Sequence, residues 1–132
     1  MNLIIAGTRE WTDYPALTRV LGVALERTGW HPTTIVSGMA LGVDLGGIWW
    51  ACERGIPYDP HPADWTTHGR AAGPIRNREM ALVADAAIIL AYAHSRGSLD
   101  CLRACRCYGL PVVWCDAATG RMRLHPRTGD TP

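Results

Sequence analysis

Five short clusters along the chain combine glycine, hydroxyl, acidic and arginine side chains. They are Gly7-Thr8-Arg9, Ser37 to Asp44, Asp64-Trp65, Gly69 to Arg78, and Ser95 to Ser98. Glycines let a ligand approach backbone N–H groups, and guanidinium groups match phosphate with two parallel hydrogen bonds. A tryptophan offers a stacking surface for a base. The clusters therefore predict a phosphate-containing, nucleotide-type ligand, and the expected ligand-binding residues are Gly7, Thr8, Arg9, Ser37, Gly38, Met39, Asp44, Asp64, Trp65, Arg76, Asn77, Arg78, Ser95, Gly97 and Ser98.

Each cluster also has a purely structural explanation. The carboxylate of Asp44 can interact favourably with the helix dipole in the first turn of a helix. The stretch from Ser37 to Asp44 is explained equally well by contact with a phosphate or ribose and by turn formation. Arg76 and Arg78 lie two residues apart, so they cannot share the centre of one helical face. Arginines near a helix start favour a compensating anion. Three nearby histidines are interpreted as incidental: His61, His68 and His94.

Apolar runs and helical spacing alternate along the chain. Strands are expected at residues 3–6, 33–36, 56–58, 86–91 and 111–115, and the third is an edge strand because of Pro60 and Pro62. Helices are expected at 14–28, at 43–54, from Pro74 onward and at 99–108. Asp13 and Gly29 are the expected caps of the first helix. Residues Ala63 to Gly73 are polar and irregular, which predicts a long loop.

This alternation predicts one α/β domain with a Rossmann-like, three-layer architecture. The expected sheet is mainly parallel and five-stranded, with helices on both faces. Ligands of such folds bind beyond the carboxyl ends of the strands, where polar and glycine clusters follow the first four strands. The domain is expected over residues 1–116. Residues 117–132 form a short extension or tail, in which 121–125 either add a strand or remain irregular.

The amino-acid composition does not indicate a particular class of partner. Thirteen basic and 12 acidic residues give a formal net charge of +1, and all the basic residues are arginine. The five cysteines are not spaced like paired zinc ligands, so neither a metal site nor a cofactor is expected. The N-terminal apolar run is too short for a signal peptide, and no segment approaches the roughly 20 apolar residues that span a bilayer. A cytoplasmic protein without a membrane partner is expected.

Taken in order, the clusters resemble the SLOG superfamily. That group includes the LOG phosphoribohydrolases, the DprA/Smf DNA-processing proteins and the YspA-like family, to which the match is closest. The motifs run in family order from Leu3 to Cys115, and they are Gly7-Thr8-Arg9, Ser37 to Asp44, Pro62-Ala63-Asp64-Trp65, Ala72 to Arg78, and Ser95 to Ser98. The resemblance implies a Rossmann-like sheet and a site for nucleotides or nucleotide-derived ligands.

The sequence departs from the family patterns at two places. Leu41 stands where SGxARGxD-type sequences carry arginine, so one phosphate contact is missing. The stretch from Ser95 to Cys101 corresponds to the PGGxGTxxE loop of the LOG enzymes, but it lacks the double glycine and the catalytic glutamate. Asp100 lies near that position, and Arg76 resembles the arginine of the second LOG motif. These departures argue against N-glycosidic hydrolysis.

The first functional hypothesis is a sensor or sequestering protein, possible in a mobile element or phage, for a nucleotide, cyclic nucleotide or ADP-ribose-like signal. The alternative is a nucleotide-processing hydrolase of phosphoribohydrolase type, with Arg76 orienting the phosphate and Asp100 acting at the glycosidic carbon. Nucleic-acid binding is a third and weaker hypothesis, and nucleic acid is not the expected partner, because the charge is near neutral and the chain is short compared with DprA. A homo-oligomer is expected, because Trp49 and Trp50 cannot both face one helix partner, so that one of them is available to cover a subunit interface. The alternative is that it packs under the Asp64 loop.

Overall fold

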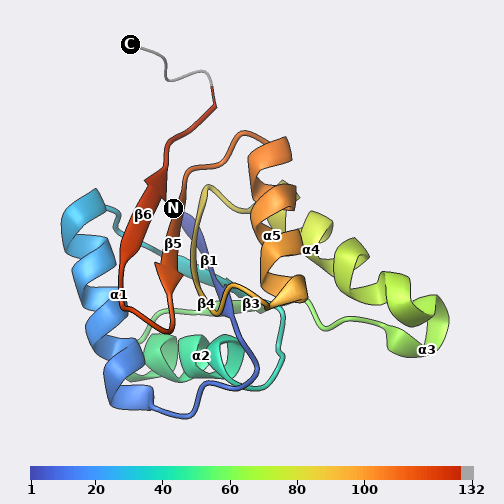
Figure 1. Cartoon of the computed structure of the whole chain (residues 1–132), viewed down its shortest axis with the longest axis horizontal. Helices are drawn as coiled ribbons and strands as arrows, with labels where there is room; N and C mark the ends of the chain where they lie inside the picture. Colours follow the sequence, from blue (N-terminus) through green and yellow to red (C-terminus); the bar gives the residue numbers. More distant parts are fainter. Residues whose placement is uncertain (129–132) are drawn as a thin grey trace.

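Six strands form one sheet at the centre of the molecule, in the order β3-β2-β1-β4-β5-β6 (Figure 1). The computed structural model describes residues 1–128. The first five strands run parallel to their neighbours, whereas β6 is antiparallel to β5. The strands are β1 (Asn2–Gly7), β2 (Thr34–Ser37), β3 (Tyr58–Pro60), β4 (Ala86–Ala91), β5 (Val112–Asp116) and β6 (Met122–His125).

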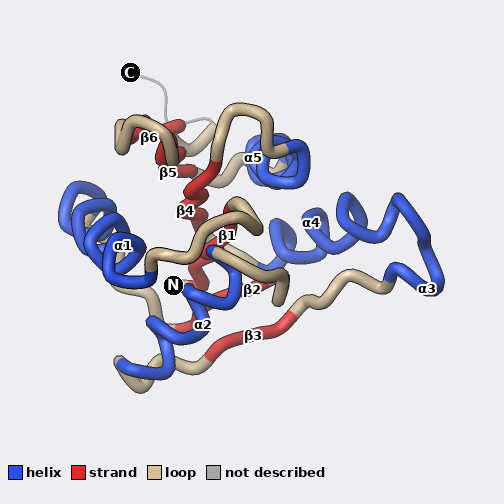
Figure 2. Tube along the Cα trace, turned by 60° about the horizontal axis from the view of Figure 1, so that its bottom comes forward, coloured by secondary structure: helices blue, strands red, loops and turns tan. Residues whose placement is uncertain are grey.

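Helices cover both faces of this sheet, so the molecule has three layers (Figure 2). Side chains alternate along a strand, and β1 therefore contributes Leu3 and Ile5 to one core and Ile4 and Ala6 to the other. The first core lies against α1 and α2, and the second against α4 and α5. The helical elements are α1 (Tyr14–Thr28), α2 (Val43–Glu53), α3 (Trp65–His68), a 3-10 turn (Gly69–Ala71), α4 (Ala72–Val83) and α5 (Arg96–Cys107).

The predicted fold class is confirmed, and so are its most local signals. The side chain of Asp13 accepts a hydrogen bond from the N–H of Ala16 at 3.0 Å, which caps the start of α1. Gly29 ends that helix in the left-handed conformation, with φ at 73°, and its N–H donates to the carbonyl of Leu25. Strand β3 lies at the sheet edge, as the prolines around it predicted.

The predicted loop over residues Ala63 to Gly73 is wrong. Most of this segment is helical, as α3, the 3-10 turn and the start of α4, and α3 projects away from the sheet (Figures 1 and 2). Periodicity could not reveal α3, because none of its residues is buried. The available signal was its cap, since Asp64 accepts a hydrogen bond from the N–H of Thr67 at 3.1 Å.

One helix start differs from the sequence-based expectation, and of the two alternatives for residues 121–125 the structure has the strand. Helix α5 begins at Arg96 and not at residue 99, so Gly97 and Ser98 belong to its first turn. Strand β6 extends the five expected strands to six, and it joins part of the expected 117–132 extension to the sheet. Residues 129–132 of that extension lie outside the described residues. Within residues 1–128, no helix has both the length and the apolar character needed to cross a bilayer.

The two adjacent tryptophans of α2 point to different environments. Trp50 is 4% exposed and belongs to the core beneath α1 and α2. Trp49 is 63% exposed, where its ring lies 5.5 Å from that of Tyr14 and its indole N–H donates to Glu53. Neither side chain packs under the Asp64 segment in the way the alternative interpretation required. Homo-oligomerisation through the exposed face of α2 stays a prediction.

Candidate functional site

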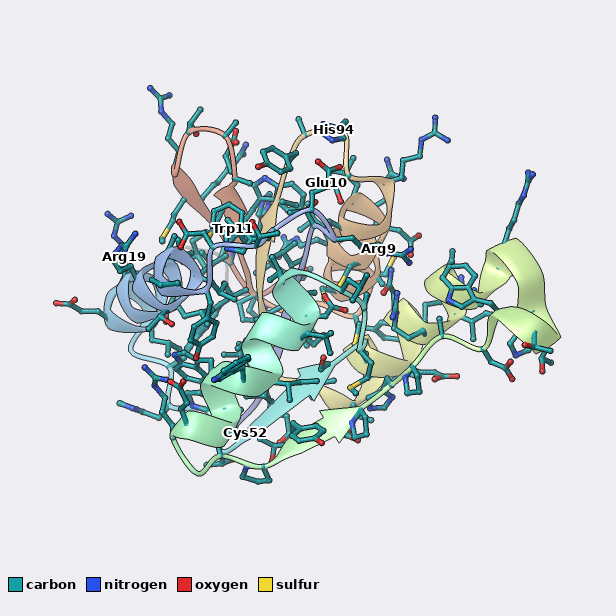
Figure 3. All side chains as sticks on the ribbon, turned by 90° about the horizontal axis from the view of Figure 1, so that it is seen from below. Arg9, Glu10, Trp11, Arg19, Cys52 and His94 are labelled. Carbon is teal, nitrogen blue, oxygen red and sulfur yellow. The ribbon has the colours of Figure 1, made fainter. Side chains whose placement is uncertain are left out.

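A cavity of about 530 Å³ opens beyond the carboxyl ends of β1 and β4. The chain after β1 turns to one face of the sheet and the chain after β4 to the other, so the cavity lies at the topological switch point where such folds bind ligands. Figure 3 shows Arg9, Glu10 and His94 gathered at this end of the molecule, with Cys52 at the far end of α2. We call this space the first hollow.

The guanidinium of Arg76 is buried in the wall of the first hollow. Its Nη1 donates to the carbonyl oxygen of Gly38 at 2.7 Å, and its Nε donates to Oδ1 of Asn77 at 3.0 Å. Within residues 1–128 no protein group accepts a hydrogen bond from Nη2. A Cβ atom at Gly38 would lie 2.5 Å from Nη1 of Arg76, so only glycine allows this approach. The arginine is thus held in place and keeps donor capacity for a ligand.

Asp44 is buried beside this arginine at the start of α2. Its Oδ1 accepts from the N–H of Gly7 at 3.2 Å, and its Oδ2 accepts from the N–H of Ala40 at 3.3 Å. Burial raises the pKa of Asp44 from 3.8 to about 6, although the charge of Arg76 and the two backbone donors act in the opposite direction. Asp44 therefore ties the β1 and β2 loops together and carries a proton more readily than an exposed aspartate.

We expect this raised pKa to make stability depend on pH between about 4 and 6. Because the folded protein binds the Asp44 proton more tightly than the unfolded chain, the free energy of unfolding falls as pH rises through this window and is flat above it. The shift corresponds to about 3 kcal/mol. Urea denaturation of the wild type and Asp44→Asn measures it, because the difference between them cancels the other carboxyl groups. A pH-independent difference would contradict the prediction.

The loop from Ser37 to Asp44 uses several of its N–H groups within the protein. The N–H of Met39 donates to Oγ of Ser37 at 3.2 Å, and the N–H of Val43 donates to the carbonyl of Thr8 at 3.1 Å. With the bond from Ala40 to Asp44, three potential anion donors are already satisfied. Turn chemistry explains these donors, and the loop contributes to the hollow mainly by positioning Arg76 and Asp44.

The first turn of α5 also borders the first hollow. The first N–H groups of an α-helix have no acceptor within the helix, and its N-terminus attracts negative charge. Asn77 holds this turn in place, because its Nδ2 donates to Oδ2 of Asp100 at 2.8 Å and to the carbonyl of Gly97 at 3.3 Å. Ser95 donates to Ser98 through their hydroxyl groups at 2.8 Å. This side of the hollow can therefore receive an anion.

Arg9 and Trp65 meet at the mouth of the first hollow. The guanidinium carbon of Arg9 lies 5.7 Å from the centroid of the Trp65 ring, within the range of a cation–π interaction. The ring is 50% exposed, which leaves surface for a stacked base. At the rim, His94 and Glu10 approach to 3.4 Å (Figure 3).

A smaller hollow of about 300 Å³ adjoins the first. We call it the second hollow. It lies between the loop after β2 and the segment after β3, and its wall consists of Arg9, Gly38, Met39, Ala40, Leu41, Pro62, Ala63, Trp65 and Arg76. Met39 has a φ of 64°, an uncommon conformation for a residue other than glycine and one that is found more often at functional sites.

Most residues predicted from the sequence border one of the hollows. The first hollow contains Gly7, Thr8, Arg9, Asp44, Trp65, Arg76, Asn77, Ser95, Gly97, Ser98 and the alternative catalytic Asp100. Gly38 and Met39 border the second. Three expected residues line neither: Ser37, which is buried and donates to the carbonyl of Asp44; Asp64, which caps α3; and Arg78, which is exposed on α4.

The first hollow also includes polar residues that were not among the predicted ligand-binding residues. Glu10, His94 and Arg96 border it; Glu10 and His94 lie next to a predicted cluster in the sequence, and Arg96 lies within one. His94 was interpreted as incidental, because a single histidine in a loop carries no spacing signal. Position after a strand end was the only sequence feature that could have included these three residues.

Comparison with known proteins identifies the family. A family model described as the YspA, cpYpsA-related SLOG family matches residues 1–68. The Gene 61 protein of Mycobacterium phage D29 is 32% identical over 118 residues, which cover 85% of this chain and 94% of that protein. The chain belongs to the YspA, cpYpsA-related SLOG family. The resemblance predicted from the motif order is thereby confirmed.

A solved structure of DNA processing protein A from Helicobacter pylori shares the fold, with a TM-score of 0.57 at 22% sequence identity. The match covers 87% of this chain but only 65% of that one, and the description of that structure concerns its binding of single-stranded DNA. This finding contradicts the expectation that nucleic acid is not the partner. Net charge averages over the whole surface, whereas binding to a strand depends on the cations and aromatic rings of one groove.

Proposed function

We propose that this SLOG-family protein binds a nucleotide or nucleotide-derived ligand in the first hollow, as a sensor or sequestering protein. The observation that carries the proposal is the buried guanidinium of Arg76, which is fixed by Gly38 and Asn77 and retains an unused donor nitrogen at the cavity wall. A cation held in this way favours phosphate, which accepts paired hydrogen bonds from guanidinium.

The rest of the hollow fits the other parts of a nucleotide. The first turn of α5 also borders the hollow and provides N–H groups, so that a phosphate would be contacted both by these groups and by Arg76. Trp65 offers a half-exposed ring for the base, next to the cation of Arg9. Asp100 can accept a hydrogen bond from a ribose hydroxyl through one carboxylate oxygen, while its Oδ2 accepts from the side chain of Asn77. The 85% coverage by a phage protein fits an origin in a phage or another mobile element.

The same chemistry could come from a free nucleotide or from one nucleotide of a DNA single strand. Isothermal titration calorimetry distinguishes the two when the protein is titrated with AMP, ADP, cyclic AMP, ADP-ribose, their guanine counterparts and a ten-residue thymidine oligonucleotide. Strand binding falls steeply with salt because many counterions are released, whereas a mononucleotide shows a shallow dependence. Recovery of a free base from the same samples would favour the hydrolase alternative. Absence of binding to every probe would refute the proposal.

Arg9 gives a matched test of where the ligand binds. We expect Arg9→Gln to weaken the binding of the preferred nucleotide by roughly tenfold, because it removes a charged contact at the mouth of the hollow. Arg19→Gln removes the same charge from the exposed face of α1, away from the hollow, and should leave affinity unchanged (Figure 3). Equal losses in the two variants would indicate a general charge effect and not a site at the first hollow.

A further inference from the structure

The two hollows adjoin one another. Both are bordered by Arg9, Ala40, Trp65 and Arg76, so these residues form the boundary between them. The segments on either side of the second hollow are fixed to the sheet, because Ser37 is the register partner of Pro60 and its carbonyl accepts from the N–H of His61 at 2.7 Å. The second hollow is thus formed by segments that the sheet holds in place, and it lies next to the first.

Charge is distributed unequally between the two spaces. All the acidic residues at the site, namely Glu10, Asp44 and Asp100, border the first hollow and not the second. The second hollow combines the two shared arginines with apolar side chains, among them Met39, Leu41, Pro62 and Ala63. A space of this kind suits a flat, uncharged ring that is attached to an anion at its edge.

The positions of the two cations specify where that anion lies. Arg9 and Arg76 stand at the boundary, so a phosphate bound by both would have one hollow on each side. The hollows measure about 530 and 300 Å³, and ligand pockets in proteins range from roughly 300 to 1,000 Å³. Each space can therefore take a group of its own. Trp65 borders both, with its Cη2 3.4 Å from where a Cβ at Gly73 would lie.

We propose that the second hollow is a subsite for a second base, so that the protein takes a dinucleotide whose bridging phosphates lie at Arg9 and Arg76. This inference rests on the proposed function, and it narrows the ligand from any nucleotide to one with a nucleoside on both sides of the phosphates. The larger hollow holds one nucleoside against Trp65 and the first turn of α5. The smaller one holds the second base among Met39, Leu41 and Ala63.

Two matched ligand pairs test the subsite by calorimetry: ADP against diadenosine diphosphate, and GDP against diguanosine diphosphate. Each pair has the same number of phosphates and differs by one nucleoside. The mononucleotide carries more negative charge, so charge alone would favour it over the dinucleotide. We expect the preferred dinucleotide to bind about tenfold tighter than its partner, because a second base is stacked and desolvated.

Filling the second hollow provides the matched variant. Ala63 borders only that hollow, and Ala63→Trp should bring the affinity for the dinucleotide down to that for the mononucleotide while leaving mononucleotide binding unchanged. Retained mononucleotide binding shows that the variant is folded. Ala118→Trp places the same side chain on an exposed turn after β5 and should change neither affinity.

The outcomes separate the two proposals. If ADP or GDP binds but the corresponding dinucleotide binds no tighter, the second-base subsite is refuted and the proposed function stands. If Ala63→Trp weakens both ligands of a pair equally, the subsite is also refuted. If none of the four ligands binds, the second-base subsite is refuted, whereas the proposed function fails only if AMP, cyclic AMP, ADP-ribose, their guanine counterparts and the oligonucleotide do not bind either. A ten-residue thymidine oligonucleotide that binds more tightly than either dinucleotide would overturn the free dinucleotide as the ligand, because contacts would then extend beyond the two hollows.

Discussion

Replacing Arg76 with Ala is expected to weaken nucleotide binding by about 100-fold, the loss typical of removing one member of a buried charge pair. Arg76 is 9% exposed, and its guanidinium is oriented by the carbonyl of Gly38 and the side chain of Asn77. Because its position is fixed before the ligand arrives, no side-chain entropy is lost when a phosphate binds. Calorimetry with the preferred nucleotide measures the change in dissociation constant.

Arg78 gives the matched control for this experiment. It lies two residues further along α4, it is exposed, and it borders neither hollow. Arg78→Ala removes the same charge from the same helix and should leave the dissociation constant unchanged. Equal effects in the two variants would contradict the role assigned to Arg76. Arg76→Lys should retain only part of the affinity, because an ammonium group cannot reproduce the planar set of donors.

An independent readout separates a local effect of Arg76→Ala from general damage to the fold. The charge of Arg76 lowers the pKa of Asp44, against the larger opposing effect of burial. Without that charge the pKa of Asp44 rises further, and the pH at which stability stops falling should move above 6. Urea denaturation at several pH values follows this change. An unmoved pH profile would show that the two groups do not interact.

The sequence was sufficient for the architecture because its signals are local and repeated. Asp13 and Gly29 bounded α1 through contacts made within one turn, and apolar runs located the buried strands. The sheet edge at β3 followed from the prolines around it, since proline cannot donate to a strand ladder. Each of these inferences depends on residues adjacent in the chain.

The segment before α4 could not be predicted in the same way. Helix α3 has no buried face, so its stability depends on the cap of Asp64 and on the turn that follows, and hydrophobic periodicity does not register it. The start of α5 was placed too late for a related reason. Gly97 resembles a loop residue in the sequence, whereas in the structure it lies in the first turn of the helix and its carbonyl accepts a hydrogen bond from Asn77.

Part of the candidate site was likewise predictable from local sequence signals, and part was not. Residues that directly follow a strand were predicted to gather at one edge of the sheet, and Thr8, Arg9 and Ser95 do so. The spacing of two residues shows that Arg76 and Arg78 point in different directions from α4. It does not show which of the two faces the hollow, because that depends on the orientation of the helix against the sheet. The second hollow depends on tertiary contacts between the loops after β2 and β3, which no local pattern encodes.

Gly7→Ala is expected to destabilise the protein by about 3 kcal/mol or more, the upper end of what overpacking costs. A Cβ at this position would lie 2.0 Å from the carbonyl oxygen of Leu90 and 2.9 Å from Cβ of Val43. The oxygen belongs to the backbone of β4, which pairs with β1 at this point and also accepts from the N–H of Thr8. Relief of the clash therefore requires the two central strands to separate at the edge that carries the hollow.

Gly22→Ala is the control with the opposite expected sign. Gly22 lies on the exposed side of α1, and a Cβ atom at this position would have no neighbouring atom within 4 Å. Alanine there adds helix propensity without a clash and should stabilise the protein by roughly 0.5–1 kcal/mol. Urea denaturation of both variants measures the two changes on one scale. A wild-type midpoint for Gly7→Ala would mean that β1 and β4 can part at little cost. The edge of the sheet at the switch point would then be flexible, and it would not hold Arg76, Asp44 and the first turn of α5 in fixed positions.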